Sequence, residues 1–368
     1  MVKVSVIMPV YNAEDFLRES INDILNQTLK DLELICVDDG STDKSLEILN
    51  NIAKEDSRVQ VYHQKNKGGG AARNVALTYA TGKYLYCMDA DDSIKKNALK
   101  ELYQIAEDKQ LDFVMFRATN YNVDTGEYQY IKYFIMDEVA EKVGENIFSY
   151  RDLGDLIFKT SSTPWCKFYN LDFVKKTGAQ FAEGLIFHDN IFWWDILLNS
   201  ERIYFYKEYL YIRKNHSKSS TGAGDKRYID AITISDLIWD IFTKHGLFDN
   251  YKTGLGVRKF DQIYHWYQKI QPQYKELYFE AMKENYQKIF DDKEFYDYII
   301  DDLTRKSREI FLTTVSSTNH KEFELKMENN QLKKKVKKYR RINKEMQNST
   351  SWKITKPLRQ IKKTFKRS

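Results

Sequence analysis

Five short apolar runs in the first 117 residues alternate with segments of helical spacing. The runs are VSVIMP at 4–9, LELICV at 32–37, VQVYH at 59–63, KYLYCM at 83–88 and LDFVMF at 111–116. Between the first two, Phe16, Leu17, Ile21, Ile24 and Leu25 recur at the spacing of one helix face. Continuous apolar strands separated by helices are typical of a parallel sheet covered by helices on both faces. The pattern predicts an α/β fold that binds ligands beyond the carboxyl ends of its strands.

The rest of the chain follows other patterns. Residues 120–220 mix aromatic strands with short helices, residues 226–315 have helical, tyrosine-rich spacing, and residues 320–347 form a polar helical stretch. In that stretch Leu325, Leu332, Tyr339 and Met346 lie seven residues apart, a weak coiled-coil pattern. We therefore expect a first domain at 1–221, whose halves meet between 117 and 118, a helical region at 222–320 and a helical tail at 321–368.

Charge is unevenly distributed along the chain. Its net charge is +5, but residues 333–368 hold 15 Lys or Arg and one acid, Glu345, a net of +14. Residues 1–332 therefore carry −9. An acidic body with a strongly basic tail indicates an anionic partner for the tail alone.

The end of the tail has the spacing of an amphipathic helix. Ile354, Leu358, Ile361 and Phe365 are four, three and four residues apart, with Lys and Arg between them. One apolar stripe on a basic helix is typical of a helix that lies on an anionic membrane surface. Self-association of the chain as a homo-oligomer is the alternative use of this helix.

Cysteine use and hydropathy indicate a cytoplasmic protein. The three cysteines, Cys36, Cys87 and Cys166, form no C-x-x-C pair, and so sparse a set indicates reduced thiols. No stretch approaches the ~20 apolar residues that span a bilayer. The apolar run at 4–10 lacks the flanks of a signal peptide. We expect a soluble protein, or a peripheral one on the inner face of the cytoplasmic membrane.

Four polar clusters follow predicted strands. They are PVYN at 9–12, DDGS at 38–41, GGGAARN at 68–74 and DADD at 89–92. Asp38 or Asp39 can accept a hydrogen bond from a base or a ribose. A glycine-led helix start with Arg73 favours a diphosphate. Asp89 and Asp91 project to one side of an extended segment, and their hard oxygens suit Mn²⁺ or Mg²⁺.

These clusters, in this order and spacing, resemble the family 2 glycosyltransferases with the GT-A fold. The resemblance is strong over 1–117 and looser from there to 221. It implies a mostly parallel, Rossmann-like sheet flanked by helices, with a nucleotide-binding half at 1–117 and an acceptor half at 118–221. It also implies an inverting enzyme that takes a hexose from a nucleotide-sugar donor, UDP-hexose or UDP-N-acetylhexosamine, with a divalent metal ion.

The resemblance assigns roles to individual residues. The nucleotide-sugar is expected to contact Pro9, Tyr11, Asn12, Asp38, Asp39, Gly70, Arg73, Asp89, Ala90 and Arg213. The metal is expected at Asp91, with His216 as a candidate second ligand. The E-D pair of the family, whose Asp is the catalytic base, reads His188-Asp189 here, so Asp189 is the expected base. Trp165 and Trp194 are candidate stacking surfaces for the acceptor, with a place in the core as the alternative for each.

The pathway and the rival functions rest on weaker signals. SWKITKPLR at 351–359 resembles a tail of bacterial surface-polysaccharide glycosyltransferases, which points to capsule, lipooligosaccharide or a related polymer. A catalytically degenerate nucleotide-sugar-binding protein is one alternative, and the intact Asp89, Asp91 and Asp189 count against it. A protein that binds nucleic acid through its basic tail is another, and the acidic body counts against it. An oxidoreductase would need G-x-G-x-x-G where PVYNAE stands.

Overall fold

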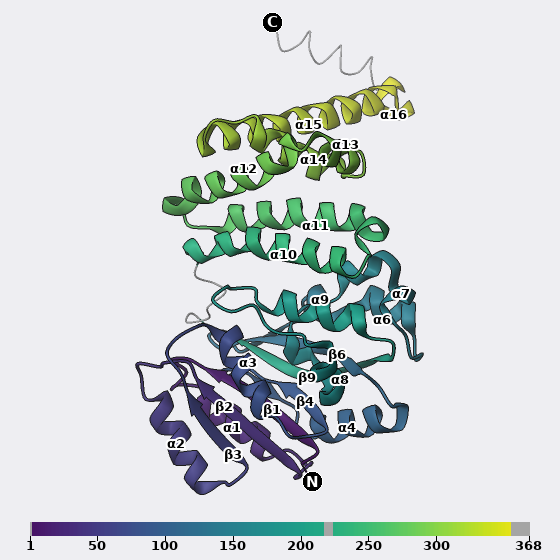
Figure 1. Ribbon diagram of the computed structural model, residues 1–368. Coiled ribbons are helices and arrows are strands. Elements are labelled where there is room, and N and C mark those ends of the chain that lie inside the picture. The colour runs from purple at the N-terminus through teal and green to yellow at the C-terminus, as the bar shows by residue number, and fades with distance from the viewer. Residues whose placement is uncertain (1, 217–223, 355–368) are drawn as a thin grey trace, which may run out of the picture.

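A mixed β-sheet forms the centre of the first domain in the computed structural model, which describes residues 2–216 and 224–354 (Figure 1). Its strands are β1 Val4–Val10, β2 Leu32–Asp38, β3 Val59–His63, β4 Tyr84–Cys87, β5 Ser93–Ile94, β6 Phe113–Asn122, β7 Glu127–Gln129, β8 Lys167–Asn170 and β9 Ile203–Asn215. Their order across the sheet is β3-β2-β1-β4-β8-β6-β9-β5, and β7 pairs with β6.

The first four strands confirm the predicted parallel sheet. β1 pairs in parallel with both β2 and β4, and β3 continues the sheet beyond β2. All seven residues of β2 are buried, as are six of the seven residues of β1. Such continuous burial fits strands that are covered on both faces. The carboxyl ends of β1, β2 and β4 therefore meet at one edge of the sheet.

The second half of the sheet differs from the prediction. The expected fifth strand at 111–116 is the start of β6, but β8 lies between it and β4 and runs antiparallel to both. β9 then pairs in parallel with β6. Phe168 and Tyr169 of β8 are fully buried, so this short strand fills a position that is apolar on both faces. The two halves of the predicted domain share one continuous sheet.

Helices cover the sheet and then form a separate stack. Those of the first domain are α1 Leu17–Leu25, α2 Ser45–Glu55, α3 Gly69–Tyr79, α4 Ala98–Lys109, α5 Lys132–Ile135, α6 Asp137–Val143, α7 Tyr150–Leu153, α8 Leu171–Thr177 and α9 Asp189–Asn199. The stack beyond α9 comprises α10 Asp230–Lys244, α11 Phe248–Lys269, α12 Lys275–Asp291, α13 Lys293–Ile300, α14 Arg305–Val315, α15 His320–Asn348 and α16 Thr350–Ile354. Figure 1 shows these helices lying layer upon layer above α9.

Two hydrophobic clusters hold these parts together. One surrounds the sheet and reaches into α10 and α11, and the other joins α10–α15. Trp239 and Phe248 pack against both clusters, so the stack rests directly on the first domain. The second cluster includes Phe323 and Met327, which places the first turns of α15 with the helical region. Among the described residues, no helix combines the length and the apolar character needed to cross a bilayer.

Candidate active site

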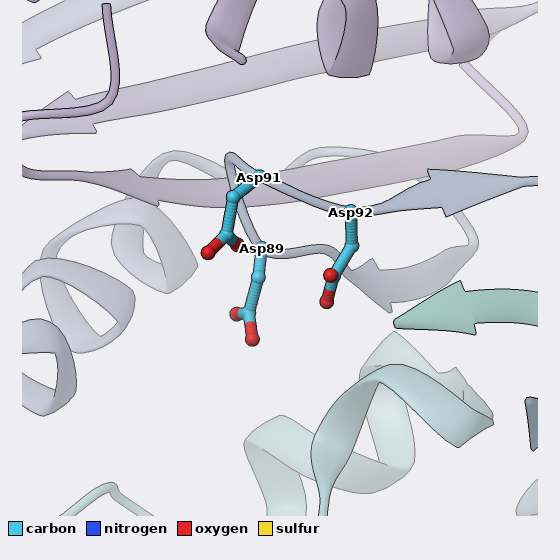
Figure 2. Close-up of side chains that lie close together, drawn as sticks. All are labelled: Asp89, Asp91 and Asp92. Atoms are coloured by element: carbon cyan, nitrogen blue, oxygen red, sulfur yellow. The ribbon is translucent and has the colours of Figure 1, made fainter. Parts of the chain in front are cut away.

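Three acids cluster in the loop after β4. Asp89, Asp91 and Asp92 each offer a carboxylate oxygen, and these oxygens lie within 4.8 Å of one another (Figure 2). Burial raises the pKa of Asp89 above its usual value and raises that of Asp92 much further, with the neighbouring acids adding to both shifts. Clustered hard oxygens whose negative charges repel one another suit a divalent ion such as Mg²⁺ or Mn²⁺. The donor set therefore fits the expected metal.

β9 fixes the least exposed of these acids. Asp92 accepts hydrogen bonds from the Tyr211 hydroxyl at 2.5 Å and from the Lys214 backbone N–H at 2.7 Å. The sequence pattern left Asp92 without a role, although it belongs to DADD. Its partner Tyr211 stood in the aromatic segment that resembled the family, but nothing along the chain indicated that the two would meet. β9 thus sets the shape of the acidic loop from a position more than a hundred residues away.

His216 lies beside Asp91. Its Nε2 is 2.9 Å from Oδ2 of Asp91, and its ring stacks on Phe16 with centroids 4.3 Å apart. The structure therefore brings together the two residues that were predicted to bind the metal. Phe16 was not predicted to belong to the site; its ring holds the imidazole at the end of β9.

Arg73 connects the acidic loop with the start of α9. This side chain is 6% exposed and donates from Nη2 to Oδ1 of Asp89. Its Nη1 is 3.3 Å from Nε2 of His188 and 4.0 Å from Oδ1 of Asp189. Burial acts to lower the pKa of Arg73, but Asp89 and Asp189 outweigh it and the pKa is raised, so the guanidinium stays charged. Arg73 was expected at a diphosphate, and here it pairs with carboxylates.

Asp189 is the first residue of α9 and lies next to His188. Its Oδ1 is 2.8 Å from Nδ1 of His188. The aromatic run Phe192-Trp193-Trp194 that follows Asp189 in the sequence predicts a raised pKa for this carboxyl, with a protonated His188 acting against the rise. The structure contradicts the predicted rise. Burial does act upwards, but His188 and Arg73, with a contribution from Lys167, outweigh it and leave the pKa of Asp189 below its usual value. The carboxylate is therefore ionised at neutral pH, as a proton acceptor must be.

The predicted nucleotide residues gather after β1 and β2. Tyr11 is 51% exposed, and Asn12 accepts a hydrogen bond from the Thr42 backbone at 2.8 Å. Asp39 is buried and receives hydrogen bonds from Gln64 and from the backbone of the loop before α3. Asp38 is also buried, but its Oδ1 has no hydrogen-bond partner among the described residues. Of the two acids, Asp38 has a buried oxygen without a hydrogen bond, whereas Asp39 organises the loop.

The other predicted contacts are more scattered. Pro9 belongs to β1, and Ala90 is buried between the loop acids. Arg213, on β9, donates to Oδ1 of Asn215 at 2.6 Å. A Cβ added to Gly70 would lie 2.3 Å from the carbonyl oxygen of Ala182. This glycine therefore allows α3 to pack against the chain before α9.

Two tryptophans predicted to stack on the acceptor belong to the core. Trp165 is 3% exposed and Trp194 is 1% exposed. Trp165 stacks on Tyr211 with centroids 4.5 Å apart, and Trp194 packs edge-on against Phe242. Since their faces are covered by other side chains, the geometry corrects the predicted stacking role in favour of core packing.

Comparisons with known proteins agree on the family. The family model described as glycosyl transferase family 2 matches residues 5–176. The chain is 34% identical over 222 residues to the glycosyltransferase GlyG of Streptococcus pneumoniae, which covers 59% of this chain and 72% of GlyG. It is 40% identical over 141 residues to the poly(ribitol-phosphate) beta-glucosyltransferase of Bacillus spizizenii, covering 33% of this chain but only 22% of that relative.

A solved structure extends the likeness to the fold. The crystal structure of S. aureus TarS 1-349 in complex with UDP-GlcNAc superimposes with a TM-score of 0.64 at 20% identity. The match covers 85% of this chain and 87% of that one, so it includes much of the helical stack. Together with the sheet and the acidic loop after β4, these findings place the chain in glycosyltransferase family 2, with the GT-A fold followed by a helical region.

Proposed function

We propose that this chain transfers a hexose from a nucleotide-sugar donor to a hydroxyl of a glycan acceptor and inverts its anomeric configuration. One observation carries the proposal: the Arg73 guanidinium contacts Asp89 of the acidic loop and lies 4.0 Å from Asp189. Asp89 belongs to the loop that would face the donor diphosphate, and Asp189 is the carboxylate that would accept a proton. The Arg73 side chain thus lies between the two acids. A structural salt bridge would not need this second carboxylate at the start of α9.

The donor is proposed to be a UDP-hexose or a UDP-N-acetylhexosamine. Its base would stack on the exposed ring of Tyr11 and hydrogen-bond to Oδ1 of Asp38, which has no hydrogen-bond partner among the described residues. A protein of similar fold, TarS, was crystallised with UDP-GlcNAc, which supports a uridine nucleotide without identifying the sugar. The remaining nucleotide contacts are proposed at Pro9, Asn12, Ala90 and Arg213.

A divalent ion, Mn²⁺ or Mg²⁺, would be held by Asp89 and Asp91, with His216 as a further ligand. When bound, such an ion supplies positive charge that stabilises a diphosphate leaving group. Asp92 is engaged by Tyr211 and Lys214, so it would shape the loop while the other two acids face the ion.

Asp189 would act as the general base. Its carboxylate accepts the proton of the acceptor hydroxyl while the hydroxyl oxygen forms a bond to the anomeric carbon. The bond from that carbon to the diphosphate oxygen breaks, and its electron pair leaves with the nucleoside diphosphate. The lowered pKa of Asp189 keeps the carboxylate ionised before each turnover. Arg73 would hold the acidic loop and the base in register through its contacts to both.

The acceptor is proposed to belong to a bacterial surface polysaccharide, such as capsule or lipooligosaccharide. Relatives support this class, because one of them is a poly(ribitol-phosphate) beta-glucosyltransferase. The tail resemblance points to the same class of pathway. We further propose that the protein works at the cytoplasmic face of the membrane.

The basic tail would provide the membrane contact. Every residue at 331–348 of α15 is exposed, and Leu332, Val336 and Tyr339 are 51%, 47% and 65% exposed along one side of it. Ile354 is 70% exposed at the end of the described chain, whereas Leu358, Ile361 and Phe365 of the predicted stripe lie outside the described residues. Apolar side chains on a basic helix suit an anionic bilayer.

Substitution of Asp189 by Asn tests the catalytic assignment. Asp189→Asn is nearly isosteric, so it should bind UDP-sugar as the wild type does and lose about 10²- to 10⁴-fold in transfer rate. Asp195→Asn, on the same helix, is the matched control and should retain activity. Transfer by Asp189→Asn at the wild-type rate, or a product that NMR shows to retain the donor's anomeric configuration, would contradict the proposal.

A further inference from the structure

Arg258 reaches the start of α9 from the helical stack. It lies on α11, and its Nη2 donates to Oδ1 of Asn190 at 2.6 Å. Its guanidinium carbon is 5.4 Å from the centre of the Trp194 ring, one turn further along α9. Asn190 is 6% exposed and is itself held by a hydrogen bond to the Phe187 carbonyl. Arg258 is thus fixed beside the residue that directly follows Asp189.

Close packing of α11 makes this reach possible. Gly254, one turn before Arg258 on the same helix face, lies so near Phe158 that a Cβ there would be 2.1 Å from the ring. A larger residue at 254 would push α11 away from the first domain. The position of Arg258 is therefore built into the contact between the stack and the domain that holds the site.

Arg258 forms no ion pair with a carboxylate in the part of the chain that the structure describes. Among residues 2–216 and 224–354, Arg58, Arg73 and Arg117 form ion pairs with carboxylates, but the hydrogen bond of Arg258 goes to a neutral amide. Its buried Nε has no hydrogen-bond partner in the same part of the chain. Burial lowers the pKa of Arg258, and among the described residues it is Tyr133, not a carboxylate, that acts against this shift. A cation withdrawn from water without a counter-charge is unfavourable unless a ligand supplies one.

We propose that Arg258 binds an anionic group of the acceptor, a phosphate or a carboxylate. The planar guanidinium pairs with either group through two parallel hydrogen bonds. This inference rests on the proposed function, in which Asp189 lies beside the acceptor hydroxyl. Arg73 contacts Asp89, on the proposed donor side of the site. Arg258 instead contacts Asn190, near the start of α9. Because Asn190 directly follows Asp189, an acceptor that extends from Asp189 along the start of α9 would bring a charged substituent to Arg258.

Binding of small anions to the donor-filled site tests the proposal. The full chain is saturated with UDP and Mg²⁺, so that a phosphate probe cannot occupy the donor site. Glycerol 3-phosphate, methyl β-D-glucuronide and neutral methyl β-D-glucoside are then titrated and followed by NMR. We expect the wild type to bind one of the two anions at least tenfold more tightly than the glucoside. Which anion is preferred distinguishes a phosphate-bearing acceptor from a uronic acid.

Variants assign the preference to Arg258. Arg258→Gln should lose it, Arg258→Lys should keep part of it, and Arg308→Gln, a remote arginine of the stack, should keep all of it. Equal binding of the three probes by the wild type would overturn the inference without reference to any variant, and so would an undiminished preference in Arg258→Gln. Because no sugar is transferred in this measurement, its outcome is separate from the Asp189→Asn test. Normal transfer by Asp189→Asn would refute the proposed function and leave the anion preference standing.

Discussion

One guanidinium serves two carboxylates at this site. Arg73 pairs with Asp89 and also lies near Asp189, while His188 stands between Arg73 and Asp189. The charge on any of these groups therefore affects the others, because they interact in a partly buried setting where water screens them weakly. The pKa of Asp189 therefore depends on Arg73, His188 and Asp89 together.

Removing His188 should shift the acid limb of the pH profile. In His188→Gln the largest influence that lowers the pKa of Asp189 is gone, while burial still raises it. The pKa of Asp189 should rise, so the base becomes protonated at a higher pH and activity is lost earlier on acidification. At neutral pH the base stays ionised, and the change in rate should be smaller there than at pH 5.

A profile of kcat against pH at saturating substrates measures this shift. His245→Gln is the control. His245 follows α10 and lies 3.8 Å from Asp195, an acid of α9 other than the proposed base. A limb that stays in place or moves to lower pH in His188→Gln would show that His188 does not act on Asp189.

The sequence predicted the identity of the base but not its surroundings. Asp189 could be found from its place in a His-Asp pair before an aromatic run. The effect of Arg73 could not, since 115 positions separate it from His188 and only the packing of α3 against the chain before α9 brings them together. Because the sequence does not show that Arg73 lies beside Asp189, the aromatic run after Asp189 indicated the wrong direction for the pKa of this carboxyl.

At the scale of elements, α3 depends on close contact with the chain before α9. Gly70→Ala would place a methyl group 2.3 Å from the Ala182 carbonyl oxygen, and backbone cannot yield as a flexible side chain can. We expect the free energy of unfolding to fall by about 1–3 kcal/mol. Activity should fall at least tenfold, because Arg73 lies one turn along the displaced helix. Chemical denaturation and a transfer assay measure the two effects.

Thr78→Ala is the matched control for α3. Thr78 is exposed near the end of the same helix, so its loss should change neither quantity appreciably. If Gly70→Ala retained both stability and activity, the close contact between α3 and Ala182 would not be required for either.

The exposed part of α15 gives a second prediction at this scale. Removing residues 333–368 leaves Phe323 and Met327 of the second core in place, so the remaining chain should fold. The truncated protein should detach from vesicles that contain anionic lipid and still hydrolyse its donor, since each basic residue near the surface contributes about 1 kcal/mol. Vesicle flotation measures the first effect and release of nucleoside diphosphate the second.

Two results would contradict this use of the tail. Equal flotation with and without residues 333–368 would exclude the membrane contact. A change from oligomer to monomer on truncation, with no change in flotation, would instead assign α15 to self-association.

At the scale of the whole molecule, a mixed sheet and its covering helices meet a helical stack along α10 and α11. The sheet was predictable where apolar runs alternate with helices, as they do up to β4. The insertion of β8 was not, because four residues without clear alternation carry too little pattern to indicate a pairing. The stack was predictable as helical, but not its contribution of Arg258 to the neighbourhood of Asp189.

The place of β8 between β4 and β6 also matters while the protein is being made. β4 ends at Cys87, but its partner on one side begins only at Lys167, so that edge emerges from the ribosome unpaired. At about 5–20 residues per second, synthesis of the intervening chain takes roughly 4–16 s. An apolar strand edge exposed for so long can pair with another nascent chain. The same inserted strand that completes the sheet therefore leaves one edge of β4 open to such pairing until residues 167–170 have been synthesised.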